Sequence, residues 1–153
     1  MGYKVFISYS TDDMNLVNEL SNNIRKMGIE VYIAEHYPEL GESLPSKIER
    51  NINSSDAMVV ILTRMGARSE WVQQEIGFAK AKNKLIIPLV DEGVKIKGFI
   101  MDKEYLKINP ENIQETIDKL LPKVNELKKQ KETNQVLLWG GIAIFAVWLL
   151  TRD

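Results

Sequence analysis

The chain has 153 residues, a length that indicates one domain of ordinary size with at most a short additional segment. Lys and Arg number 20 and Asp and Glu 21, and this balance argues against nucleic acid as the main partner. There is no cysteine and only one histidine, His36, so disulfides, thiolate nucleophiles and Cys-built zinc sites are excluded, and any chemistry falls to carboxylates, hydroxyls, amides and aromatic rings.

Strand and helix patterns alternate from the N-terminus onward. Residues 3–9 are an apolar run with aromatic and β-branched side chains, which predicts a strand, and apolar residues at 17, 20, 24 and 27 predict a helix. The acidic pair Asp12-Asp13 between them is interpreted as helix-capping. Residues 29–34 predict a second strand. Residues 35–45 contain Pro, Gly and acidic side chains without periodicity, which predicts a long loop of the kind that often carries function.

The same order continues through the rest of the first 121 residues. A short helix is expected over residues 46–53 and a fully buried strand over residues 57–63. Ser69 is typical of an N-cap for a helix over residues 70–82. The remaining expected elements are a strand over 85–90, where Pro88 indicates an irregularity or an edge, a short strand over 105–108, and a helix after Asn109-Pro110.

Strands that alternate with helices in this way predict an α/β fold, an open parallel sheet with helices on both faces. Functional residues are then expected at the carboxyl ends of the strands. Because proline breaks or kinks a helix, Pro122 predicts the end of the domain, which we place at residues 1–121. Residues 122–135 are polar and rich in lysine, and we interpret them as a stalk.

Well-known phosphate and nucleophile motifs are absent from the sequence: it contains no GxxxxGK[ST], no GxGxxG after the first strand and no GxSxG. A phosphoreceiver domain has the same strand and helix order and an acidic pair like Asp12-Asp13. It also requires an acceptor aspartate after the third strand, where this chain has Thr63 and Arg64. The missing acceptor aspartate disfavours the receiver interpretation, which stays a third alternative.

Trp71 and Glu75 lie four residues apart on one predicted helix, so their side chains share a face that is offset from the apolar stripe. A glutamate on a helix surface is ordinarily solvated and inert. A large aromatic ring beside a carboxylate, however, provides a platform for a flat ring.

Four segments in order resemble the Toll/interleukin-1 receptor (TIR) domain family, prokaryotic type: FISYSTDD at 6–13, AEHYPELGESLPSKI at 34–48, SDAMVVILT at 55–63 and SEWVQQEIGFA at 69–79. The resemblance implies a flavodoxin-like fold with a five-stranded parallel sheet and, in many members, cleavage of NAD to nicotinamide and ADP-ribose or a cyclic isomer. NAD is then the substrate, and no cofactor or metal is implied.

The resemblance also implies roles for particular residues. Glu75 matches the catalytic glutamate, and Trp71 matches the aromatic residue of the same pocket. Matches in the two loops that face the substrate are Tyr9, Ser10, Glu39, Gly41 and Ser43. The sequence departs from some active members at Ser10-Thr11, where they carry basic residues, and at Ala34, where an acidic residue is usual.

The chemistry is consistent with the residues that the chain contains. Glycosidases generally use two carboxylates, one of which protonates the leaving oxygen. Nicotinamide leaves NAD as a neutral molecule because its ring nitrogen already bears the positive charge, so no general acid is needed. One buried carboxylate that stabilises the cationic ribose can suffice.

The last apolar segment, residues 136–150, has no charged side chain over 15 residues. One interpretation is a buried core helix, because 15 residues span only about 22 Å against a hydrocarbon core of about 30 Å. The segment is apolar on every face and carries Trp139 and Trp148 near its ends, so we predict a transmembrane helix over residues 136–151. Lysines precede it and only Arg152 follows, which predicts a cytoplasmic TIR domain.

The sequence therefore predicts a single-pass, C-terminally anchored membrane protein whose TIR domain faces the cytoplasm and cleaves NAD in prokaryotic antiviral defence signalling. Its expected partners are NAD, other copies of its own TIR domain in an oligomer or filament, and membrane lipid, without nucleic acid. The alternative is a non-catalytic TIR module that assembles with other TIR domains at the membrane.

Overall fold

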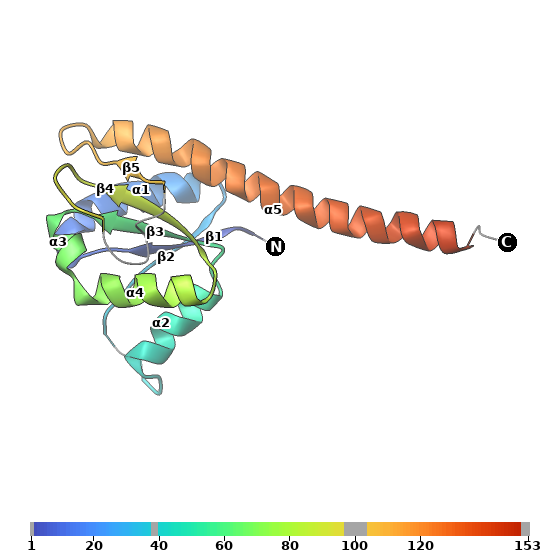
Figure 1. Ribbon diagram of the computed structural model, residues 1–153, viewed down its shortest axis with the longest axis horizontal. Helices are drawn as coiled ribbons and strands as arrows, with labels where there is room; N and C mark the ends of the chain where they lie inside the picture. The colour runs from blue at the N-terminus through green and yellow to red at the C-terminus, as the bar shows by residue number, and fades with distance from the viewer. Residues whose placement is uncertain (1, 38–39, 97–103, 151–153) are drawn as a thin grey trace.

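A five-stranded parallel sheet forms the centre of the molecule (Figure 1). The computed structural model describes the backbone of residues 2–37, 40–96 and 104–150, and side chains in these ranges as far as residue 135. The strands follow the order β2-β1-β3-β4-β5 across the sheet. Their bounds are β1 (Lys4–Ser8), β2 (Glu30–Ile33), β3 (Ala57–Leu62), β4 (Leu85–Val90) and β5 (Leu106–Lys107). The predicted five-stranded parallel sheet is confirmed.

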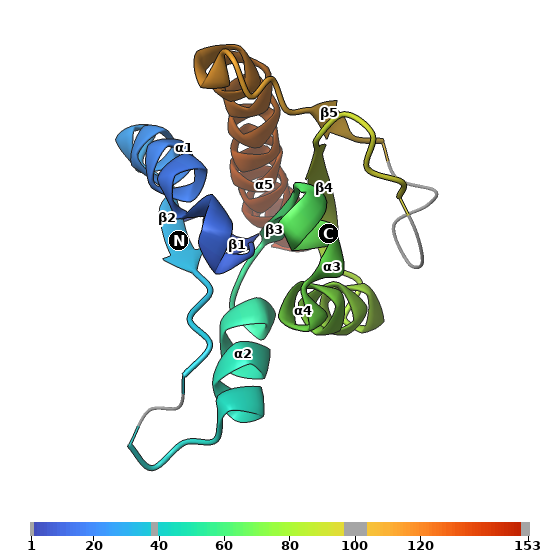
Figure 2. The same ribbon diagram turned by 90° about the vertical axis from the view of Figure 1, so that its left-hand side faces the viewer.

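Helices cover both faces of the sheet, as the sequence predicts. Figure 2 shows α1 and α5 on one face of the sheet and α2 and α4 on the other. The helical elements are the 3-10 helix η1 (Thr11–Asp13), α1 (Met14–Lys26), α2 (Leu44–Asn53), α3 (Arg64–Arg68), α4 (Glu70–Ala81) and α5 (Ile113–Leu150). All six residues of β3 are buried, because this strand has neighbours on both sides and helices on both faces.

Serine and threonine side chains fix the starts of three helices. The side-chain oxygens of Ser43, Thr63 and Ser69 accept hydrogen bonds from backbone N–H groups in the first turns of α2, α3 and α4. The cap at Ser43 and the Pro residue in the first turn start α2 two residues before the predicted boundary. Ser69 caps α4 as predicted.

The interpretation of Asp12 and Asp13 as capping acids is wrong in its detail. Asp13 stands before α1 but makes no side-chain cap hydrogen bond. Its carboxyl group instead accepts a hydrogen bond of 2.7 Å from the Thr63 hydroxyl, which joins the start of α1 to the end of β3. Desolvation raises the pKa of Asp13, with the bond from Thr63 opposing the rise.

The helix break predicted at Pro122 does not occur, because α5 runs without interruption from Ile113 to Leu150. Beyond Pro122, Val124 is fully buried and Leu127 packs against the core. The Lys128 ammonium donates to the Met27 carbonyl at 2.9 Å, and Lys131 lies 2.8 Å from an Asp56 oxygen. This packing offsets the hydrogen bond that proline removes. The first part of the predicted stalk is therefore packed on the sheet domain.

The C-terminal part of α5 continues as a helix through the apolar segment, but the side chains of residues 136–150 lie outside the described residues. Among the residues whose side chains the structure describes, no helix has both the length and the apolar character needed to span a membrane. The transmembrane helix over residues 136–151 is thus not supported by the structure.

Candidate active site

Glu75 lies in the first half of α4, and its side chain reaches the carboxyl end of β1. Its side chain is fully buried, with 0% exposure, although glutamate is rarely buried without partners. The periodicity of α4 explains the placement, because Val72, Ile76 and Ala79 face the sheet and bring Glu75 inward beside them.

Two side chains occupy the two carboxyl oxygens of Glu75. The Ser8 hydroxyl, at the last residue of β1, donates to Oε1 at 2.8 Å. The Nε2 atom of His36, in the loop after β2, lies 3.2 Å from Oε2. These partners satisfy a polar group that would otherwise be costly to bury. Three segments that are far apart in the sequence therefore meet at one carboxyl group.

Aromatic rings surround this carboxyl group on the outer side. The His36 ring stacks on Trp71, with ring centroids 5.2 Å apart and an interplanar angle of 11°. Tyr9, which follows β1, is buried, and its ring centroid lies 6.4 Å from that of His36. Desolvation raises the pKa of Tyr9, with smaller contributions from Glu35 and Glu75, so its hydroxyl stays protonated at neutral pH. Trp71 is 37% exposed and forms the outer wall.

The loop that carries His36 is held at its base by a buried lysine. The Lys47 ammonium of α2 lies 3.1 Å from the Glu35 carboxyl group and 5.1 Å from the centre of the Tyr37 ring. The residues on both sides of His36 are therefore fixed to α2, while the His36 ring points to α4.

The structure brings together three of the predicted site residues, Tyr9, Trp71 and Glu75. Ser10 instead donates to Asp12 at 3.1 Å, and Ser43 caps α2. Gly41 adopts φ +82°, which favours glycine, and no other group lies within 4 Å of the position that a Cβ would take. Glu39 lies outside the described residues. The substrate contacts predicted for these four residues stay predictions.

Sequence reasoning missed two residues of the cluster, Ser8 and His36. The strand pattern provides the signal for Ser8, because it is a polar residue at the carboxyl end of an otherwise apolar buried strand. His36 falls in the non-periodic loop 35–45, where no pattern indicates the direction of a side chain. Only the folded chain places it against Glu75.

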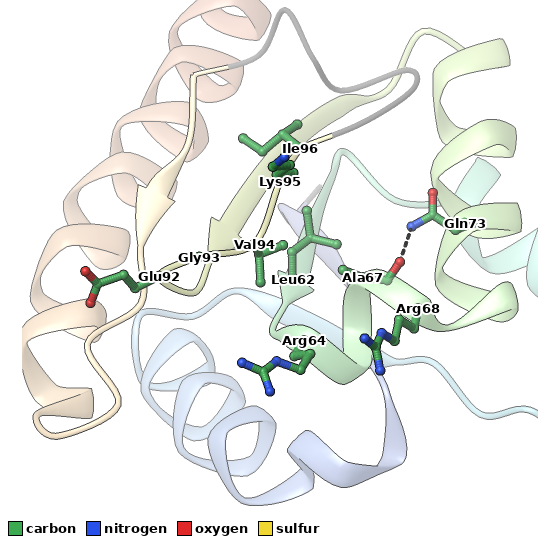
Figure 3. Close-up of a pocket in the computed structure, with 10 residues that line it drawn as sticks. All are labelled: Leu62, Arg64, Ala67, Arg68, Gln73, Glu92, Gly93, Val94, Lys95 and Ile96. Carbon is green, nitrogen blue, oxygen red and sulfur yellow. Dashed lines mark hydrogen bonds between the residues drawn. The ribbon is translucent and has the colours of Figure 1, made fainter.

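A cleft of about 360 Å³ lies apart from this cluster, between α3 and the segment after β4 (Figure 3). Its walls include Leu62, Gln73 and Val94, and Gln73 donates to the Ala67 carbonyl at 3.2 Å. None of the cluster residues lines this cleft. Among the residues that the structure describes, no group of three or more His, Asp or Glu side chains could hold a metal ion.

The sequence and the fold agree with a known family. The family model of the TIR domain matches residues 5–121, more than half of the chain. The chain belongs to the TIR domain family. The family predicted from the four segments is thereby confirmed.

Two relatives of this TIR domain carry names that describe an enzyme activity. The chain is 25% identical over 128 residues to 2′ cyclic ADP-D-ribose synthase BtTIR of Bacteroides thetaiotaomicron, covering 77% of this chain and 45% of that protein. It is 30% identical over 92 residues to NAD(+) hydrolase TcpA of a Theionarchaea archaeon, covering 57% of this chain and 28% of that protein. The chain thus spans less than half the length of either relative.

A solved structure shows the same fold. The TIR domain of the Toll-related receptor TRR-2 of Hydra magnipapillata superposes with a TM-score of 0.66 and 17% identity, covering 80% of this chain and 98% of that domain. At this identity the likeness concerns the fold alone.

Proposed function

We propose that this TIR domain cleaves the bond between nicotinamide and ribose in NAD+, and releases nicotinamide together with ADP-ribose or a cyclic ADP-ribose isomer. The observation that carries the proposal is the buried Glu75 carboxyl group, whose partner His36 stacks on the Trp71 ring. The names of BtTIR and TcpA support NAD+ as the substrate, and they are compatible with either ADP-ribose or a cyclic isomer as the product.

The proposed reaction needs one carboxylate. The bond from the ribose C1′ to the ring nitrogen breaks, its electron pair moves to nitrogen, and nicotinamide leaves as a neutral molecule. The ribose is left as an oxocarbenium-like cation, which the Glu75 carboxylate stabilises electrostatically in a water-poor site. A water molecule, or a hydroxyl group of the same nucleotide, then adds to C1′ and loses its proton.

The neighbouring side chains have roles that fit this chemistry. The Ser8 hydrogen bond of 2.8 Å holds the carboxyl group in one orientation, which reduces the reorganisation needed during reaction. The Trp71 face provides a stacking surface for the flat nicotinamide ring. The protonated Tyr9 hydroxyl adds a neutral polar group near the same position.

The test is incubation of the full-length chain with NAD+ followed by chromatographic separation of the products. Glu75→Gln is expected to remove the cleavage, because the amide has the same shape but lacks the charge. Removal of one electrostatic stabiliser costs about 10²–10³-fold in kcat in comparable sites, and we expect at least this loss. Glu70→Gln is the matched control, because Glu70 lies exposed on the same helix. Turnover by Glu75→Gln equal to that of the control would show that the assigned carboxylate is wrong.

A non-catalytic interaction module is the second candidate. The loop between β2 and α2 presents Leu40 and Tyr37 to solvent, with exposures of 106% and 60%, and exposed apolar side chains suit a protein contact. The same assay separates the candidates. A folded wild-type chain that leaves NAD+ intact at high protein concentration would favour the interaction module.

Anchoring at a membrane, with the TIR domain on the cytoplasmic side, is also part of this proposal. Its support is the sequence of residues 136–150, whose 15 residues lack any charge, together with the lysines that precede them. Confinement of the domain to a surface favours contacts between copies of the chain. A role in antiviral defence rests on the resemblance to prokaryotic members, and protection of phage-infected cells by the wild type but not by Glu75→Gln would test it.

A further inference from the structure

Both oxygens of the Glu75 carboxyl group have partners, and the enclosed side chain presents no surface to a ribose hydroxyl. Ser8 occupies Oε1 at 2.8 Å and His36 lies 3.2 Å from Oε2, and the side chain has 0% exposure. Cleavage of NAD+ by this carboxylate requires that the substrate come into contact with it. One of the surrounding side chains therefore has to move before substrate can approach Glu75.

The face of Trp71 is covered as well. The His36 ring lies parallel to the indole within 11°, at a centroid separation of 5.2 Å. A nicotinamide ring that uses Trp71 as its platform needs the same space and the same orientation. His36 thus takes two places at once, the position of the nicotinamide ring on Trp71 and the contact of the ribose with Glu75.

We propose that the His36 side chain is an internal plug that occupies the nicotinamide position and leaves it when NAD+ binds. The proposal rests on the proposed function, and it adds a residue that determines how readily substrate enters. In this arrangement the imidazole stands in for the substrate ring while the site is empty, and keeps bulk water away from the buried carboxyl group.

The positions of the surrounding side chains indicate that His36 is the one that leaves. Ser8 lies within β1, whose neighbouring strands pair with it on both sides. Trp71 belongs to a helix whose adjacent residue Val72 is fully buried. His36 lies in a segment outside the helices and strands, and its side chain is 13% exposed, so its outer edge already meets solvent.

Displacement of His36 does not require the whole loop to unfold. Lys47 lies 3.1 Å from the Glu35 carboxyl group and 5.1 Å from the centre of the Tyr37 ring, and neither contact involves the His36 side chain. Rotation of the His36 side chain about its own bonds exposes the Trp71 face while these contacts stay in place. The base of the loop then acts as a fixed support for a side-chain gate.

A plug lowers the apparent affinity for substrate by the fraction of molecules in which the site is open. A closed population of about 90% would raise the apparent Kd about tenfold. Removal of the ring should therefore lower KM for NAD+ while kcat is retained, because the plug is absent from the transition state. A residue that orients Glu75 during reaction would instead lower kcat when removed.

The first experiment uses the fact that His36 is the only histidine of the chain, so that ring-labelled histidine gives one set of NMR signals. Stacking on Trp71 shifts these signals upfield through the indole ring current. Nicotinamide added to the wild-type chain, and NAD+ added to the non-cleaving Glu75→Gln variant, should move the signals to the positions of an unstacked imidazole. Signals that keep the ring-current shift at saturating ligand would overturn the plug.

The second experiment compares two substitutions in the full-length chain. His36→Ala removes the ring and should lower KM about tenfold with kcat within about twofold. His36→Phe separates the two contacts, because it keeps a flat ring on Trp71 but lacks the nitrogen atom that contacts Glu75, and its KM should lie between those of His36→Ala and the wild type. Equal losses of kcat in both variants, with KM unchanged, would make His36 a positioning residue and contradict the proposal.

These measurements separate failure of the plug from failure of the proposed function. If the wild-type chain leaves NAD+ intact and neither ligand shifts any signal, the site assignment itself is wrong. If the wild-type chain cleaves NAD+ but the His36 signals and the KM of His36→Ala stay unchanged, only the plug is wrong.

Discussion

Truncation of α5 at two positions tests where the folded domain ends. The structure places Val124, Leu127 and Lys131 against the sheet domain, whereas the sequence pattern ends the domain at residue 121. We expect a chain that ends at residue 133 to keep the stability of the domain. A chain that ends at residue 121 should be clearly less stable, because it lacks these contacts.

The loss can be worked out from the contacts. Full burial of a valine side chain contributes about 1.5–3 kcal/mol, and Leu127 adds part of a similar amount. The hydrogen bond from Lys128 to Met27 contributes about 0.5–1.5 kcal/mol, and the partly exposed ion pair between Lys131 and Asp56 at most about 1 kcal/mol. The total of about 3–5 kcal/mol is a large part of the 5–15 kcal/mol that stabilises an ordinary domain.

Urea unfolding measures the difference directly. Both truncated chains lack Trp139 and Trp148, so Trp71 is their only tryptophan and its fluorescence reports on the folded state. With an m-value of about 2 kcal/mol per molar, the midpoint of the shorter chain should fall by about 2 M. In the longer chain, Val124→Ala should lower the free energy of unfolding by about 2 kcal/mol, and Lys129→Ala, at an exposed position of the same helix, by less than about 0.5 kcal/mol. Equal midpoints for the two truncated chains would refute the assignment of residues 122–133 to the domain.

Three further predictions concern the site, the pH dependence and the anchor. Trp71→Ala should raise KM for NAD+ and lower kcat/KM, and unchanged steady-state kinetics would place Trp71 outside the site. Desolvation raises the pKa of Asp13 in the folded state, so protonation of Asp13 favours the folded state. The contribution of this protonation to the free energy of unfolding is complete below the pKa of the unfolded state, and it is lost as the pH rises through the pKa of the folded state. Asp13→Asn should therefore unfold at a higher temperature than the wild type at pH 7, and the advantage should disappear near pH 3. Reconstitution of the full-length chain in liposomes should raise its specific activity above that of the chain ending at residue 133 at equal bulk concentration. Equal specific activities would show that the C-terminal segment only determines where the protein is located.

The fold could be predicted because its elements carry strong local signals. The buried strand over residues 57–62 is a continuous apolar run, and Ser69 marks the start of α4. Pro122 gave a misleading signal, because a local rule treats proline as a helix end. The long-range contacts of Val124 and Lys128, which lie about 100 residues from Met27 in sequence, decide the outcome instead.

The site could be predicted only as far as one helix and one loop. The spacing of Trp71 and Glu75 places both residues on one face, and the structure keeps them there. The burial of Glu75 depends on Ser8 and His36, which come from two other segments. No periodicity describes such a meeting point, since the three side chains are brought together by the strand order and not by local pattern.

The same contacts explain why a buried glutamate is compatible with a stable fold and with catalysis. Burial of a carboxyl group without partners costs several kcal/mol of free energy. While no substrate is bound, two hydrogen bonds from the protein must therefore replace those that water would otherwise provide. Ser8 provides one from a rigid strand and His36 the other from a loop. In the proposed complex with NAD+, ribose hydroxyls would replace the His36 contact, and the nicotinamide ring would replace its stack on Trp71. Because bonds of the same kind are exchanged, entry of the substrate costs little beyond movement of one side chain, while Glu75 stays fixed by Ser8 throughout.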